Sequence, residues 1–108
     1  MPVTVLLADD STTIRRYARS ILEEGDDECR VIECEHGGQA LQWLSSALDE
    51  ELPDLIILDR NMPVLTGDET VRILKLNTAW QSIPILFLTA QSDYDDIYSA
   101  KSALGVDG

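Results

Sequence analysis

Four short apolar runs recur along the chain, and three of them are nearly continuous in apolar residues instead of alternating with polar ones. Strands have this composition when helices cover both faces of their sheet. The runs occupy residues 3–8, 31–34, 55–58 and 85–88. We therefore predict four strands in a parallel sheet.

The segments between these runs show helical periodicity, with apolar residues at i, i+3, i+4, i+7 and i+8. The first stripe consists of Ile14, Tyr17, Ala18, Ile21 and Leu22, and Gly25 is expected to end its helix. The second follows Gly37 and Gly38 and consists of Ala40, Trp43, Leu44, Ala47 and Leu48. This pattern makes Trp43 a core side chain.

Two further helices are predicted from capping-box spacing, in which a hydroxyl residue precedes an acidic residue by three positions. The pairs are Thr66 with Glu69 and Ser92 with Asp95, the latter ahead of the apolar residue Ile97. Strands and helices thus alternate along the chain. This alternation predicts a single α/β domain with an open, doubly wound sheet and right-handed crossovers.

The charge of the chain limits its partners. Twenty acidic side chains against eight basic ones give a formal net charge of −12 over 108 residues. Such a surface repels nucleic acid and anionic membranes, so we expect direct binding to neither. No apolar run approaches 18 residues, and no signal-peptide pattern opens the sequence. A reducing cytoplasm is the expected location.

Polar residues end the apolar runs that we expect to be neighbours in the sheet. Asp9 and Asp10 follow the first run, Asp59 follows the third, and Thr89 with Ala90 follows the fourth. Ligands bind at the carboxyl ends of strands in such folds. Clustered carboxylates repel one another, and a hard divalent cation such as Mg²⁺ relieves this repulsion. The alternative for any single residue, such as Asp10, is a plain helix cap.

The motifs at these strand ends resemble those of response regulator receiver domains, and the resemblance extends along the whole chain. The matching segments are residues 5–11 (VLLADDS), residues 58–63 (LDRNMP) with Gly67, and residues 88–90 (LTA). This resemblance implies a flavodoxin-like receiver fold with strand order 2-1-3-4-5. It also implies a role in two-component signal transduction.

The resemblance implies a role for each matching residue. Asp59 is similar to the phospho-accepting aspartate, and Asp10 to a direct Mg²⁺ ligand with Asp9 as its partner. Asn61 matches the residue whose backbone carbonyl completes the metal ligands. The remaining matches are Thr89 as the switch hydroxyl, Ala90 as an amide donor to the phosphoryl group, and Asn61 and Gln91 as residues that tune dephosphorylation.

The implied partners are a sensor histidine kinase or phosphotransfer protein, and an output domain or downstream protein. Receivers continue through a fifth strand with an aromatic residue and a following lysine, and we expect the chain to be truncated before them. The alternative is a short variant that borrows a strand from a partner. In either case, self-association is possible through the edge of the 85–88 strand or the helix after it.

Three rival functions share some of these features. A flavodoxin-type cofactor binder has the same fold class, but Asp9 and Asp10 would repel a phosphate in its first loop. A magnesium-dependent phosphatase usually has an acid two residues after its nucleophile, where Asn61 stands. A degenerate receiver would act only as a protein-interaction module. His36 is interpreted as a solvated loop residue and not as a phosphodonor.

Overall fold

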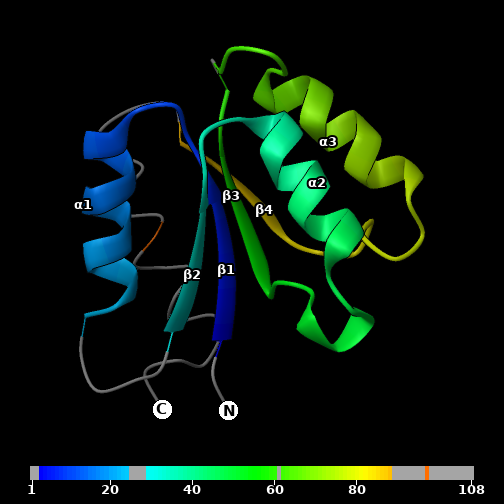
Figure 1. Cartoon of the computed structure of the whole chain (residues 1–108), viewed down its shortest axis with the longest axis horizontal. Helices are drawn as coiled ribbons and strands as arrows, with labels where there is room; N and C mark the ends of the chain where they lie inside the picture. Colours follow the sequence, from blue (N-terminus) through cyan, green and yellow to red (C-terminus); the bar gives the residue numbers. More distant parts are fainter. Residues whose placement is uncertain (1–2, 25–28, 61, 89–96, 98–108) are drawn as a thin grey trace.

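The sheet has four parallel strands in the order β2-β1-β3-β4 (Figure 1). The computed structural model describes residues 3–24, 29–60, 62–88 and 97. Its elements are β1 (Val3–Ala8), α1 (Thr12–Leu22), β2 (Cys29–Cys34), α2 (Gly37–Ser46), a 3₁₀ helix (Asp49–Glu51), β3 (Leu55–Asp59), α3 (Gly67–Leu76) and β4 (Ile85–Leu88). All four predicted strands and their parallel arrangement are confirmed.

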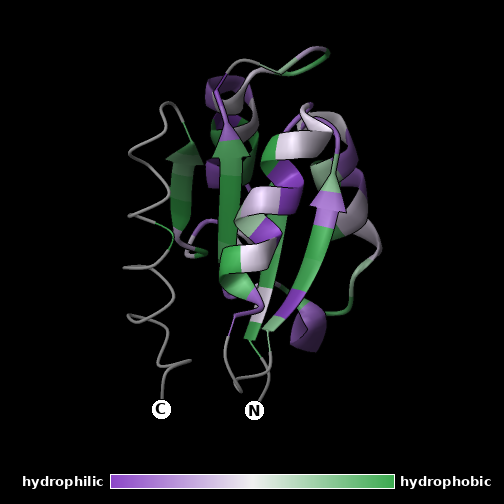
Figure 2. Cartoon of the chain, turned by 90° about the vertical axis from the view of Figure 1, so that its left-hand side faces the viewer, coloured by the Kyte–Doolittle hydropathy of each residue, from purple (hydrophilic) through white to green (hydrophobic). Residues whose placement is uncertain are grey.

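Helices cover both faces of the sheet, with α1 on one side and α2 and α3 on the other (Figure 1). Successive residues of β1 therefore point into two different cores, as strand geometry requires. Val5 and Leu7 belong to the core under α1, and Leu6 and Ala8 belong to the core under α2 and α3. All four side chains are fully buried. Figure 2 shows that the strands between the helices are predominantly apolar.

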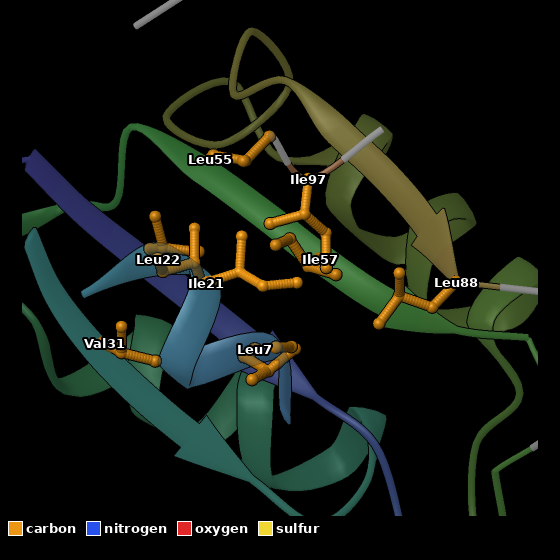
Figure 3. Packing of buried hydrophobic residues seen from close by; sticks show 10 residues of the cluster. Leu7, Ile21, Leu22, Val31, Leu55, Ile57, Leu88 and Ile97 are labelled. Atoms are coloured by element: carbon orange, nitrogen blue, oxygen red, sulfur yellow. The ribbon is translucent and has the colours of Figure 1, made fainter. Parts of the chain in front are cut away.

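The core under α1 joins that helix to the three strands β1, β2 and β3 and to Leu88 of β4. Figure 3 shows Ile21 of α1 beside Ile57 of the sheet, and Leu22 of the same helix belongs to the same core. Ile97 is also fully buried in this core, in agreement with its place on the last predicted apolar stripe. Each such side chain contributes about 1.5–3 kcal/mol through the removal of its apolar surface from water.

The helices differ from prediction in several details. Tyr17 is 55% exposed, because the inner face of α1 is formed by Arg15, Ala18, Ile21 and Leu22, so Tyr17 lies outside the core. The second helix is shorter than its stripe, since Ala47 has an extended backbone and Leu48 beyond it is 60% exposed. Trp43 only packs against the margin of the core.

The predicted helix starts can be checked in part. Gly37 and Gly38 are the first residues of α2 and do not precede it. His36 lies in the loop before α2, as predicted, but it is half-buried. It is also the N-cap of α2, because its ring accepts a hydrogen bond from the Gln39 amide. The Thr66–Glu69 capping box at the start of α3 is confirmed. The predictions at Gly25 and for the Ser92–Asp95 capping box lie outside the described residues.

The two cysteines lie at the ends of β2. Cys29 packs against the core under α1 and Cys34 belongs to the opposite core, so the two cysteines face opposite sides of the sheet. Burial raises the pKa of the Cys34 thiol to about 11, so this thiol is unreactive at neutral pH. Among the described residues, no helix is both long and apolar enough to span a membrane.

Candidate functional site

Three carboxylates meet at the carboxyl edge of β1 and β3. The two strands run parallel with Ala8 opposite Leu58, so the residues that follow each of them emerge side by side. One carboxylate oxygen from each of Asp9, Asp10 and Asp59 lies within 4.8 Å of the others. The predicted convergence of these three residues is therefore confirmed.

The three carboxylates differ in their exposure to solvent. Asp9 is buried, Asp59 is half-buried and Asp10 is exposed. The pKa of Asp9 is raised from 3.8 to about 6, mainly by burial and to a smaller extent by the charges of Asp59 and Asp10. The hydrogen bond from the Ser11 amide and the nearby Arg15 charge oppose this rise. The innermost carboxyl group thus ionises at a higher pH than an ordinary aspartate, and a nearby cation would favour its ionised form.

Hydrogen bonds to its backbone and side chain hold Asp9 in the β1–α1 loop. The Ser11 amide donates to Asp9 Oδ1 at 2.8 Å, and the Asp9 amide donates to the Cys34 carbonyl at 3.1 Å. Ser11 is also the N-cap of α1, because its hydroxyl accepts from the Ile14 amide. Asp10 is consequently not the helix cap, and this alternative for Asp10 is excluded.

A buried arginine next to this loop was missed by the sequence analysis. The Arg15 guanidinium donates to the Asp9 carbonyl oxygen, to Thr12 Oγ1 at 3.2 Å and to Glu33 Oε1 at 3.2 Å. The available signal was a charged residue directly after Ile14 and three residues before Ala18, on the inner side of an amphipathic helix. Glu33 also binds Arg19, and the Glu33 and Glu23 carboxylates raise the pKa of Arg19.

The β3–α3 loop positions Asp59 by close packing. The Gly67 amide donates to the Arg60 carbonyl at 3.0 Å, and a Cβ atom on Gly67 would lie 2.6 Å from the Asp59 carbonyl oxygen. Only glycine fits at such a distance. Val64 in the same loop has φ 72°, a strained conformation for a β-branched residue. The spacing between Asp59 and Gly67 thus has a steric basis.

The other predicted site residues lie outside the described part of the chain. They are Asn61, Thr89, Ala90 and Gln91. The strand register nevertheless constrains one end of this segment, because Leu88 pairs with Asp59 across β3 and β4. β4 therefore ends, at Leu88, on the same edge of the sheet as the three carboxylates.

The donor set suits a hard divalent cation. The cluster contains only carboxylate oxygens, which Mg²⁺ and Mn²⁺ prefer, and neither histidine nor thiolate contributes to it. The pKa of Asp9 is raised mainly by burial, and the neighbouring charges of Asp59 and Asp10 add to the rise. A bound cation would favour the ionised form of all three carboxylates, so the residues fit the metal that the family resemblance implies.

Comparisons with known proteins agree with this arrangement. A family model described as "Response regulator receiver domain" matches residues 5–108. The chemotaxis protein CheY1 of Helicobacter pylori is 30% identical over 99 residues, which cover 92% of this chain and 77% of that protein. The regulatory protein KdpE of Escherichia coli is 37% identical over 99 residues, covering 92% of this chain and 40% of that protein.

Solved structures give the same result. The chemotaxis response regulator CheY4 of Vibrio cholerae has a TM-score of 0.73 and 31% identity, with 94% of this chain and 81% of that chain covered. The Mn²⁺-bound form of response regulator Rcp1 has a TM-score of 0.73 and 28% identity, with 93% and 76% covered. The chain therefore belongs to the response regulator receiver domain family and has the flavodoxin-like receiver fold.

Membership in this family establishes the general function. The chain is a phosphoacceptor of two-component signalling, the role that its relatives among response regulators share. This assignment favours the receiver over the flavodoxin-type cofactor binder, which has the same fold class but would need a phosphate cradle where Asp9 and Asp10 lie.

Proposed function

We propose that Asp59 is the residue that accepts the phosphoryl group, with Mg²⁺ held by Asp9, Asp10 and Asp59. The observation that carries this proposal is the convergence of the three carboxylates within 4.8 Å at the carboxyl edge of β1 and β3. Asp59 is the only one of the three on β3, at the end of a strand whose four preceding residues are buried. Its carboxylate is therefore both rigidly placed and partly accessible.

The transfer is an in-line displacement at phosphorus. An Asp59 carboxylate oxygen attacks the phosphorus of a phosphohistidine, a P–O bond forms, and the P–N bond breaks. The electron pair of the broken bond returns to the imidazole nitrogen, so histidine and an aspartyl phosphate are the products. Positioning and charge neutralisation supply most of the rate enhancement in such transfers.

The cation site divides the work among the acidic residues. Asp10 is exposed and is the direct ligand, whereas buried Asp9 contributes directly or through a water molecule. The Asn61 backbone carbonyl completes the protein ligands. When bound, Mg²⁺ neutralises the developing charge on the phosphoryl oxygens. The same site serves the Mg²⁺-dependent loss of the group to water.

Residues beyond β4 complete the site in this proposal. The Thr89 hydroxyl and the Ala90 amide donate to the phosphoryl oxygens, and Asn61 and Gln91 set the rate of dephosphorylation. Support comes from the register that places Leu88 beside Asp59. The chain thereby assists its own phosphorylation and dephosphorylation and turns over no separate substrate.

The proposed partners follow from the same role. A sensor histidine kinase or phosphotransfer protein supplies the group, and an output domain or downstream protein responds, in the cytoplasm. The net charge of −12 disfavours direct contact with nucleic acid or a membrane. Residues 1–108 belong to one receiver domain in this proposal. β4 has a single neighbour among the described strands, so its edge is the proposed surface for self-association. The alternative surface, the helix expected after β4, lies outside the described residues.

Phosphorylation by a small phosphodonor tests this function. Incubation with phosphoramidate and Mg²⁺ should yield hydroxylamine-labile phosphate on the wild-type chain, and EDTA should prevent it. Asp59→Asn should abolish the label and Asp10→Ala should strongly reduce it, whereas Asp68→Asn on the exposed surface of α3 should retain it. If Asp59→Asn retains the full label, another residue accepts the phosphoryl group. If the wild-type chain carries no label, it acts only as a protein-interaction module.

A further inference from the structure

Arg15 is a buried basic residue on α1, six residues after Asp9 of the acidic cluster. The residue is 9% exposed although it lies on a surface helix, and its side chain is held by partners on three elements. These are the Asp9 carbonyl at the end of β1, Thr12 in the first turn of α1 and Glu33 on β2. Arginine is rarely buried unless all of its donors serve such partners.

The contact with Asp9 matters most, because it fixes the peptide that carries a proposed metal ligand. The amide of Asp9 donates to the Cys34 carbonyl at 3.1 Å, and its carbonyl accepts from Arg15. Both polar groups of the Asp9 backbone are thus tied to neighbouring elements. The Asp9 side chain is further held by the Ser11 amide at 2.8 Å.

The geometry depends on a guanidinium group and not only on a positive charge. Three nitrogen atoms of Arg15 each serve a different acceptor, in the fixed directions of a planar fork. A lysine would carry the same charge on one flexible ammonium group, which cannot reproduce these three directions. A lysine in place of Arg15 therefore distinguishes the effect of hydrogen-bond geometry from the effect of positive charge.

We propose that Arg15 is a positioning residue of the phosphorylation site, which sets the affinity for Mg²⁺ by holding the Asp9 peptide against α1 and β2. This inference rests on the proposed function, because it takes the three carboxylates as the metal site. Arg15 itself touches neither the cation nor the phosphoryl group. It acts through the Asp9 backbone, as groups behind metal ligands generally do.

Charge alone predicts the opposite result. A positive group near a cation site weakens cation binding, so the loss of Arg15 would then raise the affinity for Mg²⁺. However, Glu33 pairs with Arg15 at 3.2 Å and balances much of its charge. Glu33 keeps a second partner, Arg19, at 2.7 Å. We therefore expect the loss of position to dominate.

Magnesium titration of the folded chain tests the proposal. The affinity can be followed by Trp43 or Trp80 fluorescence or by amide chemical shifts, well below the melting temperature of every variant. Arg15→Lys and Arg15→Met should both bind Mg²⁺ about tenfold or more weakly than the wild type. Arg19→Met removes the outer, half-exposed contact to Glu33 and should change the affinity by less than about twofold.

Two measurements exclude a merely structural effect. Ile83 belongs to the core under α2 and α3, on the side of the sheet away from α1. Ile83→Val should lower the stability of the protein but leave its Mg²⁺ affinity within about twofold of the wild type. In the metal-free protein, hydrogen exchange of the Ser11 amide should accelerate in both Arg15 variants but not in Arg19→Met. This second readout needs no metal, so it tests Arg15 even if the wild type fails to bind Mg²⁺.

Each outcome is decisive. Weakened Mg²⁺ binding in both Arg15→Lys and Arg15→Met, with faster Ser11 exchange, supports the positioning role. Wild-type affinity in Arg15→Lys, or tighter binding in Arg15→Met, would show that only charge is involved and would overturn it. Unchanged Ser11 exchange in both Arg15 variants would also overturn it. A wild-type protein without affinity for Mg²⁺ would refute the metal site of the proposed function instead.

Discussion

The two loops that carry the acidic residues are held in place by different forces. The β1–α1 loop depends on hydrogen bonds between charged and polar groups, with the Arg15 guanidinium and the Ser11 amide around Asp9. The β3–α3 loop depends on steric fit, with Gly67 packed against the Asp59 backbone and Val64 at φ 72°. One side of the site should therefore respond to pH and metal, and the other to changes in shape.

This division suits the proposed function, in which the site binds a cation and then gains a phosphoryl group. The loop with the proposed metal ligands carries a carboxylate whose pKa is raised to about 6, so the stability of the folded protein is coupled to protons and cations at this loop. The other loop places Asp59, the proposed phosphoacceptor, on a strand end whose backbone cannot shift without displacing Gly67. Three substitutions test whether the two sides are separable in this way, in order of decreasing expected effect.

Asp9→Asn should stabilise the metal-free protein at neutral pH. The folded-state pKa of about 6 lies above 3.8, so the folded state binds this proton more tightly than the unfolded state. Its contribution to stability is complete below pH 3.8 and is lost as the pH rises through 6. The lost amount is on the order of 2–3 kcal/mol for this buried group. Asparagine remains neutral and can still accept the Ser11 hydrogen bond.

Urea denaturation between pH 3.5 and pH 8 in EDTA checks this expectation. The free energy of unfolding of Asp9→Asn should exceed that of the wild type above about pH 6 and converge with it near pH 4. Added Mg²⁺ should stabilise the wild type more than the variant, which reverses the order. Asp68→Asn is the control at an exposed position. If Asp9→Asn is less stable than the wild type at pH 8 in EDTA, the charge of Asp9 does not control the stability of the β1–α1 loop.

Gly67→Ala should destabilise the protein independently of pH. Its Cβ atom would lie 2.6 Å from the Asp59 carbonyl oxygen, 2.9 Å from Phe87 Cε1 and 3.0 Å from Arg60 Cα. Two of these neighbours are backbone atoms that cannot move aside, and overpacking of this kind costs about 1–3 kcal/mol. The displaced Asp59 should also be phosphorylated more slowly. Thermal melts between pH 5 and pH 8 give the stability, and phosphoramidate labelling gives the rate.

Gly38→Ala is the matched control for this substitution. Gly38 also lies in the first turn of a helix, but its added Cβ would approach only side-chain atoms, those of the His36 ring at 3.0 Å and of Val64 at 3.6 Å. We expect a loss well below that of Gly67→Ala. Equal losses for the two variants would mean that packing against Asp59 has no special importance.

Sequence patterns predicted the sheet and the acidic cluster because both depend on local signals. Continuous apolar runs identify buried strands, and parallel strands bring their carboxyl ends to one edge, so Asp9, Asp10 and Asp59 could be placed together. The roles of these residues came from the family resemblance and remain proposals. The boundaries of α2 were less predictable, because Ala47 and Leu48 continue its apolar stripe while the backbone has already left the helix.

The supporting contacts of the site could not be predicted in the same way. Arg15 appears in the sequence as one of three basic residues on α1, and its burial depends on Glu33 of β2, eighteen residues away. Gly67 was recognised as part of a motif, but its distance from Asp59 follows from the packing of α3 against the strand end. Such contacts arise from tertiary structure and leave no periodic signal in the sequence.

Val64→Asn should give the smallest effect, a gain in stability of about 1 kcal/mol, because left-handed backbone costs a β-branched residue of that order and asparagine tolerates it. Val64 is 76% exposed, so little apolar burial is lost. Val64→Thr keeps the branched Cβ and adds polarity, and it should stay within about 0.5 kcal/mol of the wild type.

Urea denaturation at pH 6 and pH 8 should give the same gain for Val64→Asn, because no titrating group is involved. If Val64→Thr stabilises as much as Val64→Asn, polarity and not backbone strain is the cause. The β3–α3 loop would then lack the strained, shape-controlled character that distinguishes it from the β1–α1 loop.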